Sequence, residues 1–204
     1  MRLLLLGPPG AGKGTQASIL AAKFGVPSIS TGDIFRANVN AGTLLGNRAR
    51  AFMDRGEYVP DGITNEMVRE RLAEADAAAG FLLDGYPRTV DQVRVLDELM
   101  GESGQHLCSV LQLVVPEQDL VERLLKRGAD QGRSDDTVDV IRQRLALYAS
   151  QTEPLASVYA DRGLLAVVDG RGSVDDVTAR LIEQAAEHAG TCSCLLYTSP
   201  SPRD

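Results

Sequence analysis

The 204-residue sequence has an ordinary globular composition, with 44% hydrophobic and 24% charged residues, and is long enough for one compact domain. Its net charge of −7 argues against nucleic acid or an anionic membrane as a main partner. Leu3–Leu6 is too short for a signal peptide and no apolar stretch reaches membrane-spanning length, so we expect a cytoplasmic protein.

The chain begins with an apolar run, Leu3–Leu6, that shows no alternation of polar and apolar residues. This pattern predicts a strand buried on both faces of a parallel sheet. The next segment, Gly7–Thr15, has the G-x-x-x-x-G-K spacing of a P-loop. The residue after Lys13 is Gly14, so the hydroxyl of the general motif comes one place later, at Thr15.

The residue types of this loop suit a phosphate. Glycines let several backbone N–H groups approach one anion at the N-terminus of the following helix, where the helix dipole is positive. Lys13 adds a charge for the β- and γ-phosphates. The alternative is a glycine-rich turn with an ordinary surface lysine. Because the loop lies between a buried strand and a helix pattern, we expect a nucleotide site here.

Strand and helix patterns alternate along the rest of the chain. Further strands are expected at 26–30, 80–85, 107–115 and 164–168. Helices are expected at 13–24, 116–127, 134–160 and 174–189. Others are expected from Thr31 to 57 with breaks at Gly42 and Gly56, from Asp61 or Thr64 to 74, and from Thr89 or Asp91 to 100. Thr31 and Thr43 are the expected N-caps. This order predicts an α/β fold, a five-stranded parallel sheet with helices on both faces.

The last residues, 190–204, break this pattern. They show no periodicity and contain two Ser-Pro pairs. We expect a disordered tail, and its similarity to translated vector sequence favours a non-native origin.

Four segments carry a resemblance to a known family: Gly7–Thr15, Ser30–Arg36, Asp84–Thr89 and Arg133–Asp136. Together they resemble the adenylate kinases within the nucleoside monophosphate kinase family, in the short-lid form of actinobacteria. The resemblance covers residues 1–189 and implies a P-loop three-layer fold, with a helical NMP-binding insertion at about 30–59 and a short lid at about 127–133. It implies a monomer that reversibly transfers a phosphoryl group from MgATP to AMP, giving two ADP.

The same resemblance implies a role for individual residues. The catalytic set is Lys13, Asp84, Arg88, Arg123, Arg127, Arg133 and Arg144. The ATP-binding set is Gly10, Ala11, Gly12, Lys13, Gly14, Thr15, Arg127 and Gly172. The AMP-binding set is Thr31, Arg36, Glu57, Tyr58, Val59, Gly85, Arg88, Gln92, Arg133 and Arg144.

These residue types fit the chemistry. AMP already carries an anionic nucleophile, so transfer requires alignment and charge neutralisation rather than a general base. The planar fork of an arginine binds two phosphate oxygens at once, and the amide of Gln92 can both donate to and accept from adenine. Taken alone, Arg36 is more typical of a solvated helix surface, and a charged surface helix would also place arginines at 123 and 144.

Metal binding is expected at one place and not at another. Thr15 and Asp84 would hold Mg²⁺ through water; the alternative for Asp84 is a turn or helix-cap acid. Relatives with long lids often bind zinc there through four cysteines. The segment Gly128–Gly132 has neither cysteine nor histidine, so we expect no structural zinc.

Two other functions stay open at this point. A UMP/CMP kinase would share the P-loop and the arginines, although Gln92 and the segment Glu57–Pro60 favour adenine by resemblance. A nucleotide sensor without turnover would need no transfer arginines, whereas this chain carries Arg88 and Arg133. The expected partners are therefore ATP, AMP and ADP, with no nucleic acid and no membrane.

Overall fold

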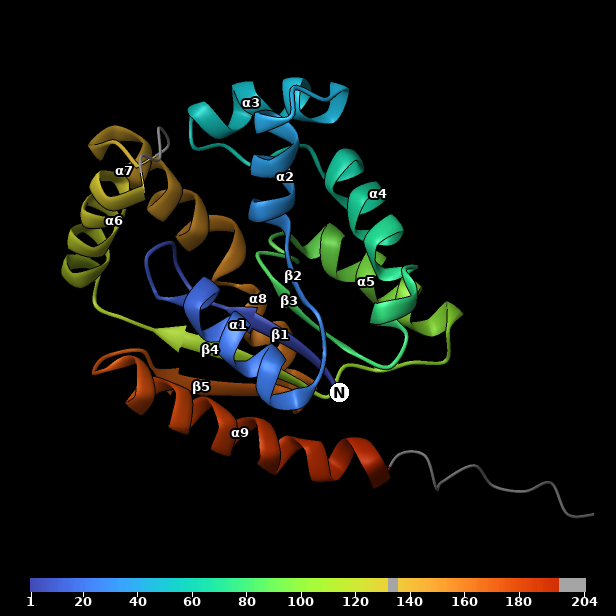
Figure 1. Ribbon diagram of the computed structural model, residues 1–204. Helices are drawn as coiled ribbons and strands as arrows, with labels where there is room; N and C mark the ends of the chain where they lie inside the picture. The colour runs from blue at the N-terminus through green and yellow to red at the C-terminus, as the bar shows by residue number, and fades with distance from the viewer. Residues whose placement is uncertain (132–135, 195–204) are drawn as a thin grey trace, which may run out of the picture.

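A single five-stranded parallel sheet forms the centre of the protein in the computed structural model, which describes residues 1–131 and 136–194, without the side chains of 131 and 189–194 (Figure 1). The strands lie in the order β2-β3-β1-β4-β5. Their bounds are β1 Arg2–Leu6, β2 Ser28–Ser30, β3 Phe81–Asp84, β4 Ser109–Val114 and β5 Leu165–Asp169. The predicted α/β fold with a parallel sheet is confirmed.

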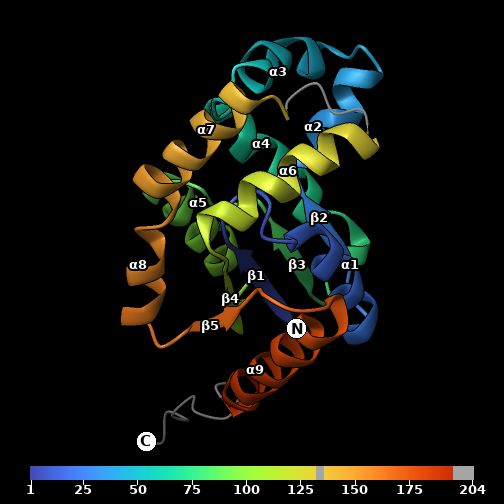
Figure 2. The ribbon, with the colours of Figure 1, turned by 90° about the vertical axis from the view of Figure 1, so that its left-hand side faces the viewer.

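Helices connect successive strands. Their bounds are α1 Lys13–Phe24, α2 Thr31–Asn40, α3 Leu44–Asp54, α4 Asp61–Leu72, α5 Val90–Glu102, α6 Glu117–Gln131, α7 Val138–Leu147, α8 Leu155–Asp161 and α9 Val174–Cys194. Two short helical turns, η1 Ala75–Ala77 and η2 Tyr148–Thr152, also occur. Both views place α3 and α9 at opposite ends of the molecule, with the sheet between them (Figures 1 and 2). Within residues 1–131 and 136–194, no helix is long and apolar enough to span a membrane.

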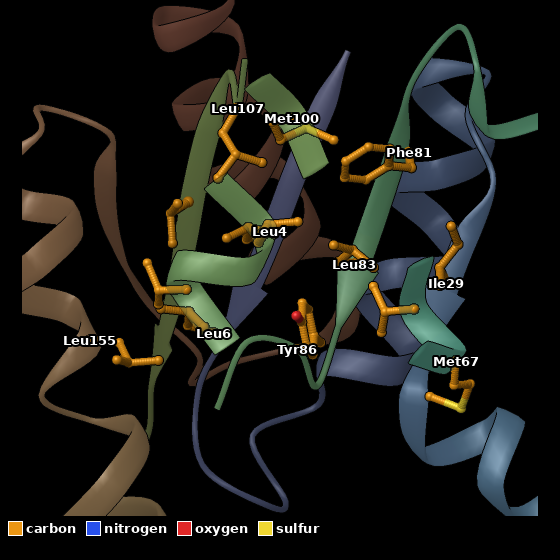
Figure 3. Close-up of a cluster of buried hydrophobic side chains, with 14 of the residues drawn as sticks. Leu4, Leu6, Ile29, Met67, Phe81, Leu83, Tyr86, Met100, Leu107 and Leu155 are labelled. Carbon is orange, nitrogen blue, oxygen red and sulfur yellow. The ribbon is translucent and has the colours of Figure 1, made fainter. Parts of the chain in front are cut away.

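The leucine run of β1 is buried because successive side chains of a strand point to opposite faces of the sheet. Leu4 and Leu6 pack with residues of α4, α5 and α8 in the cluster of Figure 3. Leu3 and Leu5 pack with residues of α1, α6 and α9 on the other face. Helices therefore cover both faces, which explains why β1 shows no alternation of polar and apolar residues.

The strand order reverses at β1. The chain passes from β1 to β2, returns to β3 beside β1, and then places β4 on the other side of β1. Leu5 of β1 lies opposite Asp84 of β3, and Leu6 lies opposite Gln112 of β4. In open parallel sheets, ligands bind outside the carboxyl ends of the strands at such a reversal. The P-loop follows β1 at this point.

Several predicted boundaries are wrong. The helix expected over 134–160 is divided into α7, the π-helical turn η2 and α8. Pro154 has no N–H and its ring crowds the preceding turn, and the backbone N–H of Glu153 instead bonds the carbonyl of Tyr148. Two helices run beyond their expected ends at 127 and 189, since α6 reaches Gln131 and α9 reaches Cys194. The rest of the expected lid loop and tail, 132–135 and 195–204, lies outside the described residues.

Of the two N-caps predicted from the sequence, Thr43 is confirmed and Thr31 is wrong. Thr43 caps α3 as predicted, and of the two alternatives for the start of α5, Thr89 and Asp91, Thr89 is the cap; each threonine accepts a hydrogen bond from the N–H three residues later. Thr31 is not the cap of α2: Ser30 accepts the bond from the N–H of Asp33, and Thr31 is the first helical residue. The hydroxyl of Thr31 is thereby free of the capping role and bonds elsewhere, as described below.

Candidate active site

A cavity of about 640 Å³ lies at the carboxyl ends of β1 and β3, a size within the usual range of small-molecule sites. Its lining comes from the P-loop, the first turns of α2, residues 56–59, the segment after β3, and α6, α7 and η2. Most of the predicted site residues line it. Ala11, which is buried, and Gly172, in the loop after β5, are absent from the lining.

The P-loop is shaped by glycines that other residues cannot replace. Gly12 caps α1 in the left-handed conformation, with φ of 93°, and the space around it is open. Backbone conformation, rather than crowding, therefore requires glycine at this position. At Gly10, a Cβ would lie 2.9 Å from the carbonyl oxygen of Leu120, so here the close approach of α6 excludes a side chain.

Lys13 folds back over this loop. Its Nζ donates to the carbonyl oxygens of Gly7, at 2.7 Å, and Pro8, at 2.9 Å. Burial lowers the pKa of the ammonium to about 8, with Arg88, Arg127 and Arg144 acting in the same direction and Asp84 against it. The ammonium is thus held by neutral acceptors and lies near three other cations. An anionic ligand would reduce the repulsion among these positive charges.

Asp84 ends β3 inside the same cavity, with 8% of its surface exposed. Burial raises the pKa of its carboxyl, while Lys13 and Arg88 oppose that rise. Within residues 1–131 and 136–194, the side-chain carboxylate of Asp84 takes part in no hydrogen bond or ion pair. A buried carboxylate without such partners is suited to a cation. Thr15, on the exposed first turn of α1, lines the same cavity.

Arg88 is held by several contacts at once. Its Nε donates to the carbonyl of Gly85 at 2.7 Å, and its backbone N–H donates to Oε1 of Gln92 at 2.7 Å. Its backbone carbonyl accepts from Oγ1 of Thr152 at 2.9 Å, and its Cζ lies 4.9 Å from the ring centre of Tyr58. Among the described residues, no hydrogen bond uses Nη1 or Nη2. The fork that would bind two phosphate oxygens therefore remains available.

Gly85 makes this arrangement possible. It has φ of 78°, and a Cβ there would lie 2.9 Å from Oγ1 of Thr31 and 3.0 Å from Nη2 of Arg88. The carbonyl of Gly85 accepts from both neighbours, since Thr31 also donates to it at 2.9 Å. Thr31 thereby joins the start of α2 to the segment after β3. Arg36, one turn later in α2, forms an exposed ion pair with Asp33.

The residues expected around the AMP base line the cavity but have partners within the protein. Glu57 forms a bidentate ion pair with Arg55, at 2.9 and 2.7 Å. Val59 is buried. Gln92 is 1% exposed, and while its Oε1 accepts from Arg88, its Nε2 donates to Asp61 at 2.7 Å. In this conformation Gln92 positions Arg88, and the contact of Gln92 with adenine stays a prediction.

The arginines of α6 and α7 have an acidic partner. Arg127 makes two bonds of 2.7 Å to the carboxylate of Asp136, and Arg144 makes one of 3.1 Å. Arg123 donates to the carbonyl of Gly170 at 3.4 Å. All three arginines line the cavity. Arg133 lies outside the described residues, so its expected role stays a prediction.

Sequence reasoning missed two residues of this site. Asp136 was expected only as a helix cap, although its side chain is fully buried between two arginines. A carboxylate next to an arginine-rich segment was the available signal. Thr152, 5% exposed, bonds the backbone of Arg88 from a turn that was expected to be ordinary helix, and no pattern in the sequence indicated it. Gly172 is not among the residues that line this cavity, and its expected contact with ATP stays a prediction.

Comparison with known proteins gives a consistent result. The family model described as adenylate kinase matches residues 5–164. A protein named adenylate kinase from Leifsonia xyli is 55% identical over 185 residues, which cover 91% of this chain and 93% of that protein. One of the same name from Thermobifida fusca is 57% identical, covering 88% of this chain and 95% of that protein. The chain belongs to the adenylate kinase family of nucleotide-binding phosphotransferases.

Proposed function

We propose that the enzyme catalyses the reversible reaction ATP + AMP ⇌ 2 ADP. The observation that carries the proposal is one cavity lined by two separate cationic groups. The P-loop with Lys13 supplies the first group, and Arg88 with Arg36 supplies the second. Two anionic nucleotides can thus be bound with their phosphates together, which is what direct transfer between them requires.

The reaction requires little covalent chemistry from the protein. A phosphate oxygen of AMP attacks the γ-phosphorus of ATP, and the bond from that phosphorus to the β–γ bridging oxygen breaks, leaving ADP on both sides. Lys13 would neutralise charge on the ATP phosphates, and the fork of Arg88 would align the attacking phosphate. Arg123, Arg127 and Arg144 would add charge on the transferred group, with Arg127 and Arg144 first exchanging Asp136 for phosphate oxygens.

Mg²⁺ fits the residues present. The buried carboxylate of Asp84 has no hydrogen-bonded partner among the described residues, and the hydroxyl of Thr15 lines the same cavity. We infer that these two residues hold the ion through water. When bound with ATP, Mg²⁺ neutralises and orients the phosphate oxygens. In the described part of the chain no group of three or more His, Cys, Asp or Glu side chains is placed to hold a metal.

The choice of acceptor is tested by measuring ADP formation from MgATP with AMP, CMP, UMP or GMP. We expect AMP to be used far better than the pyrimidine nucleotides. A preference for UMP or CMP would assign the chain to another monophosphate kinase activity, and no ADP with any acceptor would favour a sensor. The monomeric state and the cytoplasmic location stay predictions of the sequence.

A ligand that joins two adenosines through five phosphates gives an independent test. It would contact both cationic groups while losing translational and rotational freedom only once, so it should bind much more tightly than ATP or AMP alone. Calorimetry measures all three affinities, and an adenosine–uridine bridge is the matched comparison. Equal affinity for ATP and the bridged ligand would contradict the two-site proposal.

A further inference from the structure

Two hydroxyl groups connect the insertion between α2 and α4 to Arg88. The hydroxyl of Tyr58 lies 2.8 Å from Oγ1 of Thr152, and Oγ1 of Thr152 lies 2.9 Å from the carbonyl oxygen of Arg88. A threonine hydroxyl has one hydrogen, and here the carbonyl must receive it. Tyr58 is therefore the donor to Thr152, and the two bonds form a directed chain that ends on the backbone of Arg88.

The three residues belong to distant parts of the sequence. Tyr58 follows α3, Arg88 follows β3, and Thr152 ends the π-helical turn η2. Tyr58 and Thr152 are separated by 94 residues, and Thr152 and Arg88 by 64. The wider π-helical turn before Pro154 shifts the side chains of η2 relative to a regular helix. Thr152 is nearly fully buried in this turn.

Tyr58 contacts Arg88 in a second way. Its ring centre lies 4.9 Å from Cζ of Arg88, within cation–π distance. The insertion also lies close against α7, as Figure 2 shows for α3 and α7. A Cβ on Gly56 would be 3.1 Å from Cγ1 of Val140 and from Cγ of Arg144. Placement of the insertion against α7 and η2 therefore brings Tyr58 to Arg88.

We propose that Tyr58 and Thr152 are positioning residues that set the orientation of the Arg88 fork when the insertion lies against α7. The ring fixes one side of the guanidinium, and the two hydroxyls fix the peptide carbonyl of Arg88. Gln92 fixes the N–H of the same residue. The inference rests on the proposed function, because it assigns the fork to the phosphate of AMP.

The test uses Thr152→Val, which keeps the side-chain shape and removes the hydroxyl, and Tyr58→Phe, which keeps the ring. We expect each to weaken AMP binding about tenfold, corresponding to about 1.4 kcal/mol, while the KM for ATP changes less than about twofold. Thr152→Ser should restore most of the affinity. Because both variants break the same chain, the double variant should be little worse than Thr152→Val alone.

The control is Ser150→Ala, which removes an exposed hydroxyl from the same turn, where it donates to the carbonyl of Leu147. It should leave both affinities unchanged. Calorimetry with AMP alone measures the affinity for AMP without turnover. Absence of ADP formation in the wild-type enzyme would therefore contradict the proposed function and not this inference. Equal weakening of ATP and AMP, a lowered Tm with unchanged AMP affinity, or additive effects in the double variant would overturn the inference. Tyr58→Phe keeps the test valid if Thr152→Val does not fold.

Discussion

Arg88 and the pair Arg127–Arg144 line the same cavity but are held in opposite ways. Arg88 is fixed by neutral groups, namely two carbonyl or amide oxygens, a hydroxyl and an aromatic ring. Arg127 and Arg144 share the buried carboxylate of Asp136. A phosphate can bind Arg88 without displacing any charged partner. To bind Arg127 of α6 or Arg144 of α7, it must compete with the carboxylate of Asp136. The first group is preorganised, and the second has to exchange partners.

The largest expected effect comes from removing the preorganised fork. Arg88→Lys keeps the charge but loses bidentate geometry, so we expect kcat to fall roughly a hundredfold or more. Circular dichroism should show an unchanged fold. Arg94→Lys, which alters an exposed arginine paired with Asp91, is the matched control and should retain full turnover. Near-wild-type kcat in Arg88→Lys would remove this residue from the mechanism.

A second expected effect is a pH dependence from Lys13, the cation proposed to bind the ATP phosphates, whose Nζ donates to the carbonyls of Gly7 and Pro8. Burial lowers its pKa to about 8 in the ligand-free protein, so it loses its charge as the pH rises through that value. The protonated form binds phosphate, and kcat/KM for ATP should therefore fall above about pH 8, approaching about tenfold per pH unit. The profile of kcat/KM from pH 6 to 10 measures this. A flat profile to pH 10 would contradict the assigned cause.

A third expected effect, on stability rather than on turnover, concerns the carboxylate of Asp136. Asp136→Asn should lower the free energy of unfolding by about 2–4 kcal/mol, below the full cost of a broken buried pair because Arg127 and Arg144 keep 26% and 21% of their side-chain surface exposed. Asp33→Asn breaks the exposed pair with Arg36 and should cost less than about 1 kcal/mol. Denaturant unfolding compares the two. Equal losses of unfolding free energy in the two variants would mean that burial does not make the Asp136 ion pairs stronger than the exposed Asp33–Arg36 pair.

Features that depend on neighbouring residues could be predicted from the sequence. An unbroken leucine run required burial on both faces, and the spacing of Gly7, Gly12 and Lys13 required a strand–loop–helix turn. Thr43 was found as a cap for the same reason, because a cap bonds an N–H three residues away. Each of these signals acts over a few residues, where residue type and backbone conformation are directly linked.

Tertiary structure alone decided which distant groups hold the cations of the site. Asp136 is a cap candidate by local pattern, and only the packing of α6 against α7 makes it the partner of Arg127 and Arg144. Thr152 contacts Arg88 because the turn before Pro154 widens. Tyr58 contacts Thr152, although 94 residues of sequence separate the two. Such contacts depend on how whole elements pack, and the residues that make them carry no local signal of their partner.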